Sequence, residues 1–272
     1  MAHRYGLLTG VNMSADDIII TNGSQQAFDL IGKAFVDPGD TILLESPTYL
    51  GALQAFEFFE PRYEELDLGQ DGPNTEHLRT SLERHRPKFF YAIPAFQNPS
   101  GGSYSAKCRT EVARALSDHS QTILVEDDPY GELRFDGTRH RAIAADYEHS
   151  ILLGSFSKIA APGLRLGWIY APRALREPLV IAKQAADLHS GHLTQAILHR
   201  FVTEHDFDAH IDAIIARYRT HRDAMVAALR ETLPEARFSV PEGGMFLWVQ
   251  LPGCDTHALF KFATMCGVTF VP

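Results

Sequence analysis

The chain has 272 residues, of which 45% are hydrophobic and 22% charged, and its formal net charge is −9. This composition is typical of a globular protein and excludes a disordered or fibrous one, while the acidic balance argues against nucleic acid as a partner. No apolar run approaches the ~18 residues of a membrane span, no signal peptide is recognisable, and three scattered cysteines suit neither a disulfide framework nor a metal site. We therefore expect a cytoplasmic protein without membrane or metal binding.

Short apolar runs alternate with helical stretches from Ile18 to Tyr170. Strands are predicted at 18–21, 41–45, 88–93, 122–126, 151–153 and 166–170, and helices at 24–36, 49–59, after Asn74 and at 105–119. The run 123–125 is apolar throughout, as burial on both faces of a sheet demands. The alternation predicts an α/β fold, a mostly parallel sheet flanked by helices.

After Pro172 the pattern becomes helical, and apolar residues between 211 and 229 recur at the spacing of a long amphipathic helix. Beyond it, strand-like runs at 237–240, 245–251 and 268–271 surround a helical run at 256–266, which predicts a small α+β unit. We place a domain boundary near His205. Residues 1–204 form the large domain, and residues 205–272 form the long connecting helix and a partial small domain. Trp168 and Trp248 are expected in the core.

Polar clusters follow four of the predicted strands, at residues 22–25, 98–102, 126–130 and 155–158. Ligands of open α/β sheets bind beyond the carboxyl ends of the strands. The position of these clusters therefore predicts a ligand site at that edge of the sheet.

Lys158 ends the last of these clusters. A lysine shielded from water can attack a carbonyl carbon and form a Schiff base, although most loop lysines are simply solvated. Asp127 follows an apolar strand, and an adjacent carboxylate keeps the pyridine nitrogen of pyridoxal phosphate protonated. Tyr130 stands three residues later and can reach the phenolic oxygen of that ring, which favours Asp127 over Asp128. An acidic turn containing proline explains this segment equally well by itself.

The cluster at 22–26 lies between a strand and a helix, where free backbone N–H groups and the helix dipole form a phosphate site. Gly23 permits close approach, and the Ser24 hydroxyl and the Gln25 amide can donate further hydrogen bonds. Ordinary N-capping is the alternative. Arg165 can pair bidentately with a phosphate.

Two other residues have a structural and a functional interpretation. Asn98 can hydrogen-bond the ring oxygen of the cofactor, but Asn-Pro also opens many turns. Tyr49 can stack on a flat heteroaromatic ring, but as a single observation it is better explained as a core tyrosine.

Taken together, the segments Asn-Pro-Ser-Gly at 98–101, Glu-Asp-Asp-Pro-Tyr at 126–130 and Ser-Phe-Ser-Lys at 155–158, with an arginine seven residues later, form a specific set. In order and spacing the chain resembles the class I/II aminotransferases of pyridoxal-phosphate (PLP) fold type I, the aspartate-aminotransferase-like superfamily, over essentially its whole length. Residues 45–56 resemble the subgroup that includes aminoadipate, kynurenine and aromatic aminotransferases. The resemblance implies a PLP cofactor, transfer of an amino group between an L-amino acid and a 2-oxo acid, and a homodimer.

The resemblance also assigns roles to individual residues. Lys158 is implied to carry the cofactor as a Schiff base and to shift the substrate proton. Four residues are implied around the ring: Asp127 on the pyridine nitrogen, Asn98 and Tyr130 on the phenolic oxygen, and Tyr49 stacked on its face. Four are implied to hold the phosphate: Ser24, Gln25, Ser155 and Arg165.

Relatives continue at both ends, through an N-terminal arm and to an arginine that binds the substrate carboxylate, so the chain resembles a truncated member. Two alternatives remain open. One is the effector-sensing domain of an aminotransferase-like transcription regulator, and the other is a PLP β-lyase or decarboxylase on the same fold.

Overall fold

The computed structural model describes residues 1–135, 137 and 139–272. Within them eight strands form one sheet: β1 (Ile18–Thr21), β2 (Thr41–Ser46), β3 (Arg62–Gly69), β4 (Gly72–Pro73), β5 (Phe89–Ala92), β6 (Ile123–Asp127), β7 (Ser150–Ser155) and β8 (Gly167–Tyr170). The strand order is β1-β8-β7-β6-β5-β2-β3-β4. The central strands β3, β2, β5, β6 and β7 are parallel, whereas β8 is antiparallel to both β7 and β1. The predicted mostly parallel α/β sheet is confirmed.

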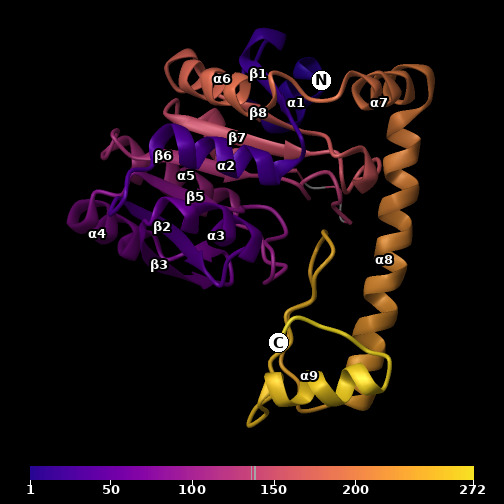
Figure 1. Ribbon diagram of the computed structural model, residues 1–272. Coiled ribbons are helices and arrows are strands. Elements are labelled where there is room, and N and C mark those ends of the chain that lie inside the picture. The colour runs from indigo at the N-terminus through magenta and orange to yellow at the C-terminus, as the bar shows by residue number, and fades with distance from the viewer. Residues whose placement is uncertain (136, 138) are drawn as a thin grey trace.

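Helices cover both faces of this sheet (Figure 1). Those in the described residues are α1 (Ala2–Thr9), α2 (Ser24–Phe35), α3 (Leu50–Phe56), α4 (Thr75–His85), α5 (Ala106–Ser117), α6 (Arg173–Asp187), α7 (His192–Glu204), α8 (Phe207–Thr232) and α9 (Thr256–Met265), with short 3₁₀ turns η1 (Ala15–Asp17), η2 (Glu57–Phe59), η3 (Ile143–Ala145) and η4 (Pro162–Leu164). Asn74 caps α4 as predicted, since its side chain accepts hydrogen bonds from the backbone N–H groups of Glu76 and His77.

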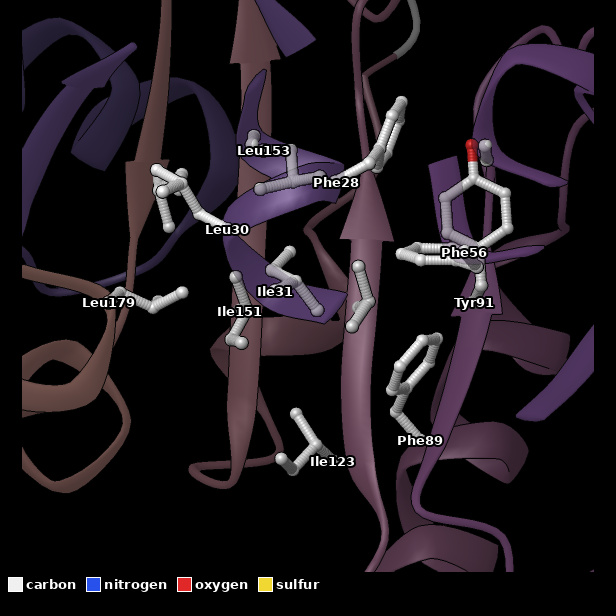
Figure 2. Packing of buried hydrophobic residues seen from close by; sticks show 14 of the residues in the cluster. Phe28, Leu30, Ile31, Phe56, Phe89, Tyr91, Ile123, Ile151, Leu153 and Leu179 are labelled. Atoms are coloured by element: carbon white, nitrogen blue, oxygen red, sulfur yellow. The ribbon is translucent and has the colours of Figure 1, made fainter. Parts of the chain in front are cut away.

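Alternate residues of the strands supply the cores on the two faces. Phe89 and Tyr91 of β5 pack with residues of α2, α3 and α6 on one face, as Figure 2 shows around Phe28 and Ile31. Phe90 and Ala92 of the same strand point the other way and pack under α4 and α5. This period of two explains the continuous apolar runs, because each central strand is covered on both sides.

A third cluster lies at the β7–β8 side of the sheet, where Trp168 packs against Tyr5 of α1 with ring centroids 4.5 Å apart. The predicted burial of Trp168 is confirmed at 1% exposure. The prediction for Trp248 is wrong, since it is 39% exposed. Its segment makes only one backbone pairing among the described residues, between Arg237 and Gln250.

The long helix α8 extends away from the sheet and carries α9 at its far end (Figure 1). Between α8 and α9 the chain approaches the sheet again, at residues 241–246. Phe135 donates its backbone N–H to the Glu242 carbonyl at 2.8 Å, and Gly244 donates to the Leu133 carbonyl at 2.9 Å. The domain boundary near His205 stays a prediction.

Sequence patterns missed β3. The adjacent Glu64 and Glu65 interrupt the alternation of charged and apolar side chains, and only Leu66 is buried, because the strand lies near the edge of the sheet beside the two-residue β4. Conversely, the strand-like runs 237–240, 245–251 and 268–271 form no strand in the described structure, because a strand needs a hydrogen-bonding partner as well as alternation. No helix within the described part of the chain is long and apolar enough to cross a membrane.

Candidate active site

The four polar clusters meet along one edge of the sheet because of strand register. Asp127 ends β6 opposite Leu153, and Ser155 ends β7 opposite Gly167 of β8. Gly167 also pairs with Thr21, the last residue of β1. The turn after β1, the segment before β8 and the ends of β6 and β7 therefore share this edge, where ligands of α/β sheets bind.

Asp127 is a buried carboxylate with one free oxygen. Its side chain is 2% exposed, and its Oδ2 accepts a hydrogen bond from the Tyr91 hydroxyl at 3.0 Å. Its Oδ1 is buried and has no hydrogen-bond partner among the described residues. A buried polar atom without a partner costs free energy, so this oxygen is suited to accept a hydrogen bond from a ligand.

Burial raises the pKa of Asp127 to about 7, although the hydrogen bond from Tyr91 acts in the opposite direction. Asp128 and Glu45 are nearby carboxylates and raise it further. A carboxyl in this state would be stabilised as the anion by a cation at its free oxygen, such as a protonated pyridine nitrogen.

Tyr130, Asn98 and Tyr49 gather near this carboxylate. The Asn98 Nδ2 lies 3.5 Å from the Tyr130 hydroxyl. Burial raises the pKa of Tyr130 and the Asp127 carboxylate raises it further. Burial also raises the pKa of Tyr49, while Asp127 raises it and Arg165 lowers it. Tyr49 therefore lies within electrostatic range of both the carboxylate and the arginine.

A cradle with the donors that a phosphate needs is formed where α2 begins. Gly23 is the N-cap, with φ 75°, and no side chain of the described residues caps the first amides of the helix. A Cβ at this position would lie 2.7 Å from Arg165 Nη2. The guanidinium thus stands directly beside free helical N–H groups, which is an arrangement that attracts anions.

The other predicted phosphate ligands are Ser24, Gln25 and Ser155, and the side chains of two of them already make hydrogen bonds within the protein. Ser24 is the first residue of α2, whereas the Gln25 side chain donates to the Gly51 carbonyl at 2.8 Å. The side chain of Gln25 is therefore already engaged, and its backbone N–H is the better donor to a phosphate. The Ser155 hydroxyl accepts a hydrogen bond from the Ser157 backbone N–H at 3.2 Å.

Lys158 follows β7 in a turn and is half-buried. Within the described residues its ammonium takes part in no hydrogen bond or ion pair. An amine without a competing partner is available for attack on a carbonyl carbon.

Two contributors were missed from the sequence. Tyr91 was taken only as part of an apolar strand, yet its alternation with Phe89 places it on the Asp127 side of the sheet. The hydroxyl of Tyr91 points toward the carboxyl ends of the strands in Figure 2. Phe246 packs edge-on against Tyr130 with centroids 5.5 Å apart. The sequence contained no local signal for this contact, which depends on the return of the chain after α8.

Residues 1–271 match the family described as aminotransferase class I and II. The chain belongs to this family. It is 44% identical over 271 residues to aromatic-amino-acid aminotransferase 1 of Thermococcus litoralis, covering 96% of this chain and 65% of the relative. It is 42% identical to 2-aminoadipate transaminase of Thermus thermophilus, covering 96% and 67%. The chain thus spans about two thirds of the length of these relatives.

Among solved structures, the chain is similar to Pyrococcus horikoshii kynurenine aminotransferase in complex with PMP, with a TM-score of 0.92 and 42% identity. The match covers all of this chain and 69% of that one. The predicted aminotransferase family and its fold type I architecture are confirmed.

Proposed function

We propose that this protein is a PLP-dependent aminotransferase that moves an amino group between an L-amino acid and a 2-oxo acid. The observation that carries the proposal is the buried Asp127 carboxylate, whose Oδ1 has no partner in the described structure. It lies at the same sheet edge as an amine and a phosphate cradle. Family membership and the names of the relatives support the same activity. By resemblance we also propose a homodimer.

The residues present fit the cofactor at both of its ends. Asp127 Oδ1 would accept the pyridine N–H, and Tyr91 would hold the carboxylate through Oδ2. At the other end, Arg165 and the first amides of α2 around Gly23 would hold the phosphate. The pKa of Tyr49 responds to Asp127 at one end and to Arg165 at the other. This suits a side chain that would lie along the cofactor ring between these two residues.

The remaining groups divide the work of catalysis. PLP, when bound, supplies an electron sink that makes the bonds of a substrate Cα labile. Lys158 Nζ would hold the cofactor between turnovers and, once freed by the substrate amine, would carry the proton from the substrate Cα to the aldehyde-derived carbon of the cofactor. Asn98 Nδ2 and the Tyr130 hydroxyl lie 3.5 Å apart, and both would donate to the phenolic oxygen and keep the ring oriented.

The test of the proposal is covalent capture of PLP. The purified protein should absorb in the visible range with PLP, and borohydride reduction should add the cofactor mass to the peptide that contains Lys158. Lys158→Ala should lose this adduct, while Lys107→Ala, at an exposed lysine, should keep it. A wild-type protein that carries no adduct at Lys158 would contradict the proposed function.

The reaction itself is separated from the alternatives by its products. We would supply 2-oxoglutarate with aromatic amino acids and 2-aminoadipate, following the names of the relatives. Glutamate without ammonia indicates transamination, ammonia indicates a β-lyase, and carbon dioxide without glutamate or ammonia indicates a decarboxylase. Cofactor binding without turnover of any donor favours the effector-domain alternative.

A further inference from the structure

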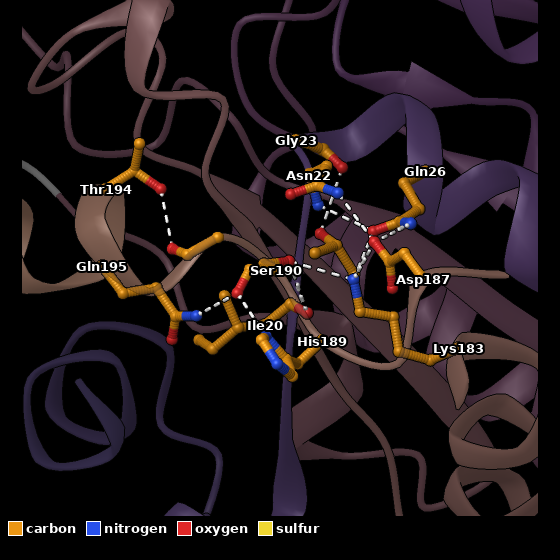
Figure 3. Close-up of polar contacts among 12 residues, drawn as sticks. Ile20, Asn22, Gly23, Gln26, Lys183, Asp187, His189, Ser190, Thr194 and Gln195 are labelled. Carbon is orange, nitrogen blue, oxygen red and sulfur yellow. Dashed lines mark hydrogen bonds and ion pairs between the residues drawn. The ribbon is translucent and has the colours of Figure 1, made fainter. Parts of the chain in front are cut away.

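A buried ionic cluster joins the end of α6 to the turn between β1 and α2 (Figure 3). Lys183 is its centre and is 5% exposed. Its ammonium donates to Gln26 Oε1 at 2.7 Å, to Asp187 Oδ2 at 2.8 Å and to the Ser190 hydroxyl at 3.0 Å. All three N–H bonds of the ammonium are therefore used. A buried lysine is tolerated when it is paired in this way.

The same cluster holds the turn at Asn22 from two sides. Gln26 Oε1, which Lys183 fixes, also accepts the Asn22 backbone N–H at 2.8 Å. The Asn22 side chain donates to Asp187 Oδ2 at 2.7 Å, and the Gln26 amide donates to the same oxygen at 2.8 Å. Removal of Lys183 would leave Gln26 Oε1 and Asp187 without their cation.

This turn precedes the phosphate cradle in the chain by a single residue. Asn22 is followed by Gly23, whose Cβ position faces Arg165 and whose left-handed φ starts α2. The hydroxyl of Thr21 also donates to the Gly23 carbonyl at 3.0 Å. The orientation of the first amides of α2 therefore depends on hydrogen bonds that end on Lys183 and Asp187. Preorganised donors bind an anion more tightly than donors that must be ordered first.

We propose that Lys183, acting through Gln26, Asn22 and Asp187, is a positioning residue for the phosphate group of the bound cofactor. The proposal rests on the proposed function for the identity of the phosphate ligand. Lys183 does not itself face the ligand: its three donors are occupied within the cluster. It acts by fixing the turn at 22–26, so its effect should be confined to the phosphate end of the cofactor.

The experiment compares PLP with pyridoxal, which has the same aldehyde and ring but no phosphate. Both would bond to Lys158, and only PLP would use the cradle. Lys183→Met keeps the length of the side chain and removes its charge and donors. The matched control is Lys33→Met on α2, where another lysine pairs with an aspartate four residues away, at 2.6 Å, but on the exposed side of the helix.

Dissociation constants from absorbance titration should separate the two ligands. Lys183→Met should weaken PLP roughly tenfold, as expected when one backbone amide of the loosened turn no longer donates to the charged phosphate, and pyridoxal by less than about twofold. Lys33→Met should change neither. Equal weakening of PLP and pyridoxal, or no change in either, would overturn the proposal. If Lys183→Met fails to fold, Gln26→Met is judged by the same ratio.

Inorganic phosphate gives a readout that does not involve Lys158. It should raise the melting temperature of the wild-type protein and of Lys33→Met, and raise that of Lys183→Met much less. A wild-type protein that forms no adduct with either aldehyde would refute the proposed function. The phosphate response would then still decide the role of Lys183, and an equal response in wild type and Lys183→Met would refute that role.

Discussion

Replacement of Asp127 by asparagine should make the cofactor-free protein more stable at alkaline pH. Burial raises the pKa of Asp127 from its ordinary value of 3.8 to about 7. An acid with a raised pKa in the folded state binds its proton more tightly when folded. Its contribution to stability is therefore full below the unfolded value and is lost as the pH rises through about 7.

The size of the effect follows from the two pKa values. They differ by about 3 pH units, and each unit corresponds to about 1.4 kcal/mol, so ionisation of Asp127 costs about 4 kcal/mol by pH 8. About 3 kcal/mol of this loss falls between pH 5 and pH 8. The asparagine side chain of the variant is neutral throughout and still accepts a hydrogen bond from Tyr91. Any change in packing free energy caused by the substitution is the same at every pH, so it cancels when the difference in stability between variant and wild type is compared at two pH values.

The assay is urea unfolding of the cofactor-free wild type and Asp127→Asn at pH 5 and pH 8. The stability of the variant relative to the wild type should rise by about 3 kcal/mol between these pH values. The carboxyl of Glu126, whose pKa burial also raises to about 7, occurs in both proteins and cancels. Glu45 also occurs in both, and its repulsion of Asp127 is already part of the raised pKa of Asp127. Asp118→Asn, at an exposed carboxylate, is the control. Parallel pH profiles for wild type and Asp127→Asn would refute the reasoning.

Two further substitutions test the ends of the site. Tyr91→Phe removes the only hydrogen bond to the Asp127 carboxylate in the described structure and should destabilise the cofactor-free protein by about 1–3 kcal/mol at pH 8. Unchanged urea unfolding would contradict the role of this bond. Gly23→Ala places a methyl group 2.7 Å from Arg165 Nη2 and should weaken PLP more than about tenfold. Gly39→Ala has a similar positive φ but open space around it, so equal PLP affinities in these two variants would contradict a steric effect on the cradle.

Local sequence predicted the elements that two-sided burial specifies. The run at 123–125 is apolar at each position because the strand is covered on both faces, and it became β6. By contrast, β3 has one buried residue, Leu66. The charged residues around Leu66 masked the pattern that would have predicted this strand. Residues 245–251 show the reverse error, because alternation indicates a strand only if a partner strand is available.

The residues of the site also fall into two groups, those that local sequence predicts and those that depend on contacts between distant segments. Lys158, Asp127 and Gly23 follow strands directly, so topology alone brings them to one edge of the sheet. Tyr91 and Lys183 act through contacts between segments distant in the sequence: Tyr91 lies 36 residues from Asp127, and Lys183 lies 157 residues from Gln26. Their neighbours along the chain are apolar or ordinary helical residues, which gave no indication of these partners.

The aspartates of these two clusters show why one points to a ligand and the other does not. Partial burial acts to raise the pKa of Asp187, but hydrogen bonds from Lys183 and Gln26 and the charge of Lys183 lower it overall. Within the described part of the chain, the groups that act on Asp127 are Tyr91, Asp128 and Glu45, and none of them is a cation. The fold thus supplies the counter-charge of Asp187 from its own residues and leaves that of Asp127 to a bound molecule. A protonated pyridine nitrogen would provide it under the proposed function, so the same carboxylate that weakens the cofactor-free fold at high pH would stabilise the protein once the cofactor is bound.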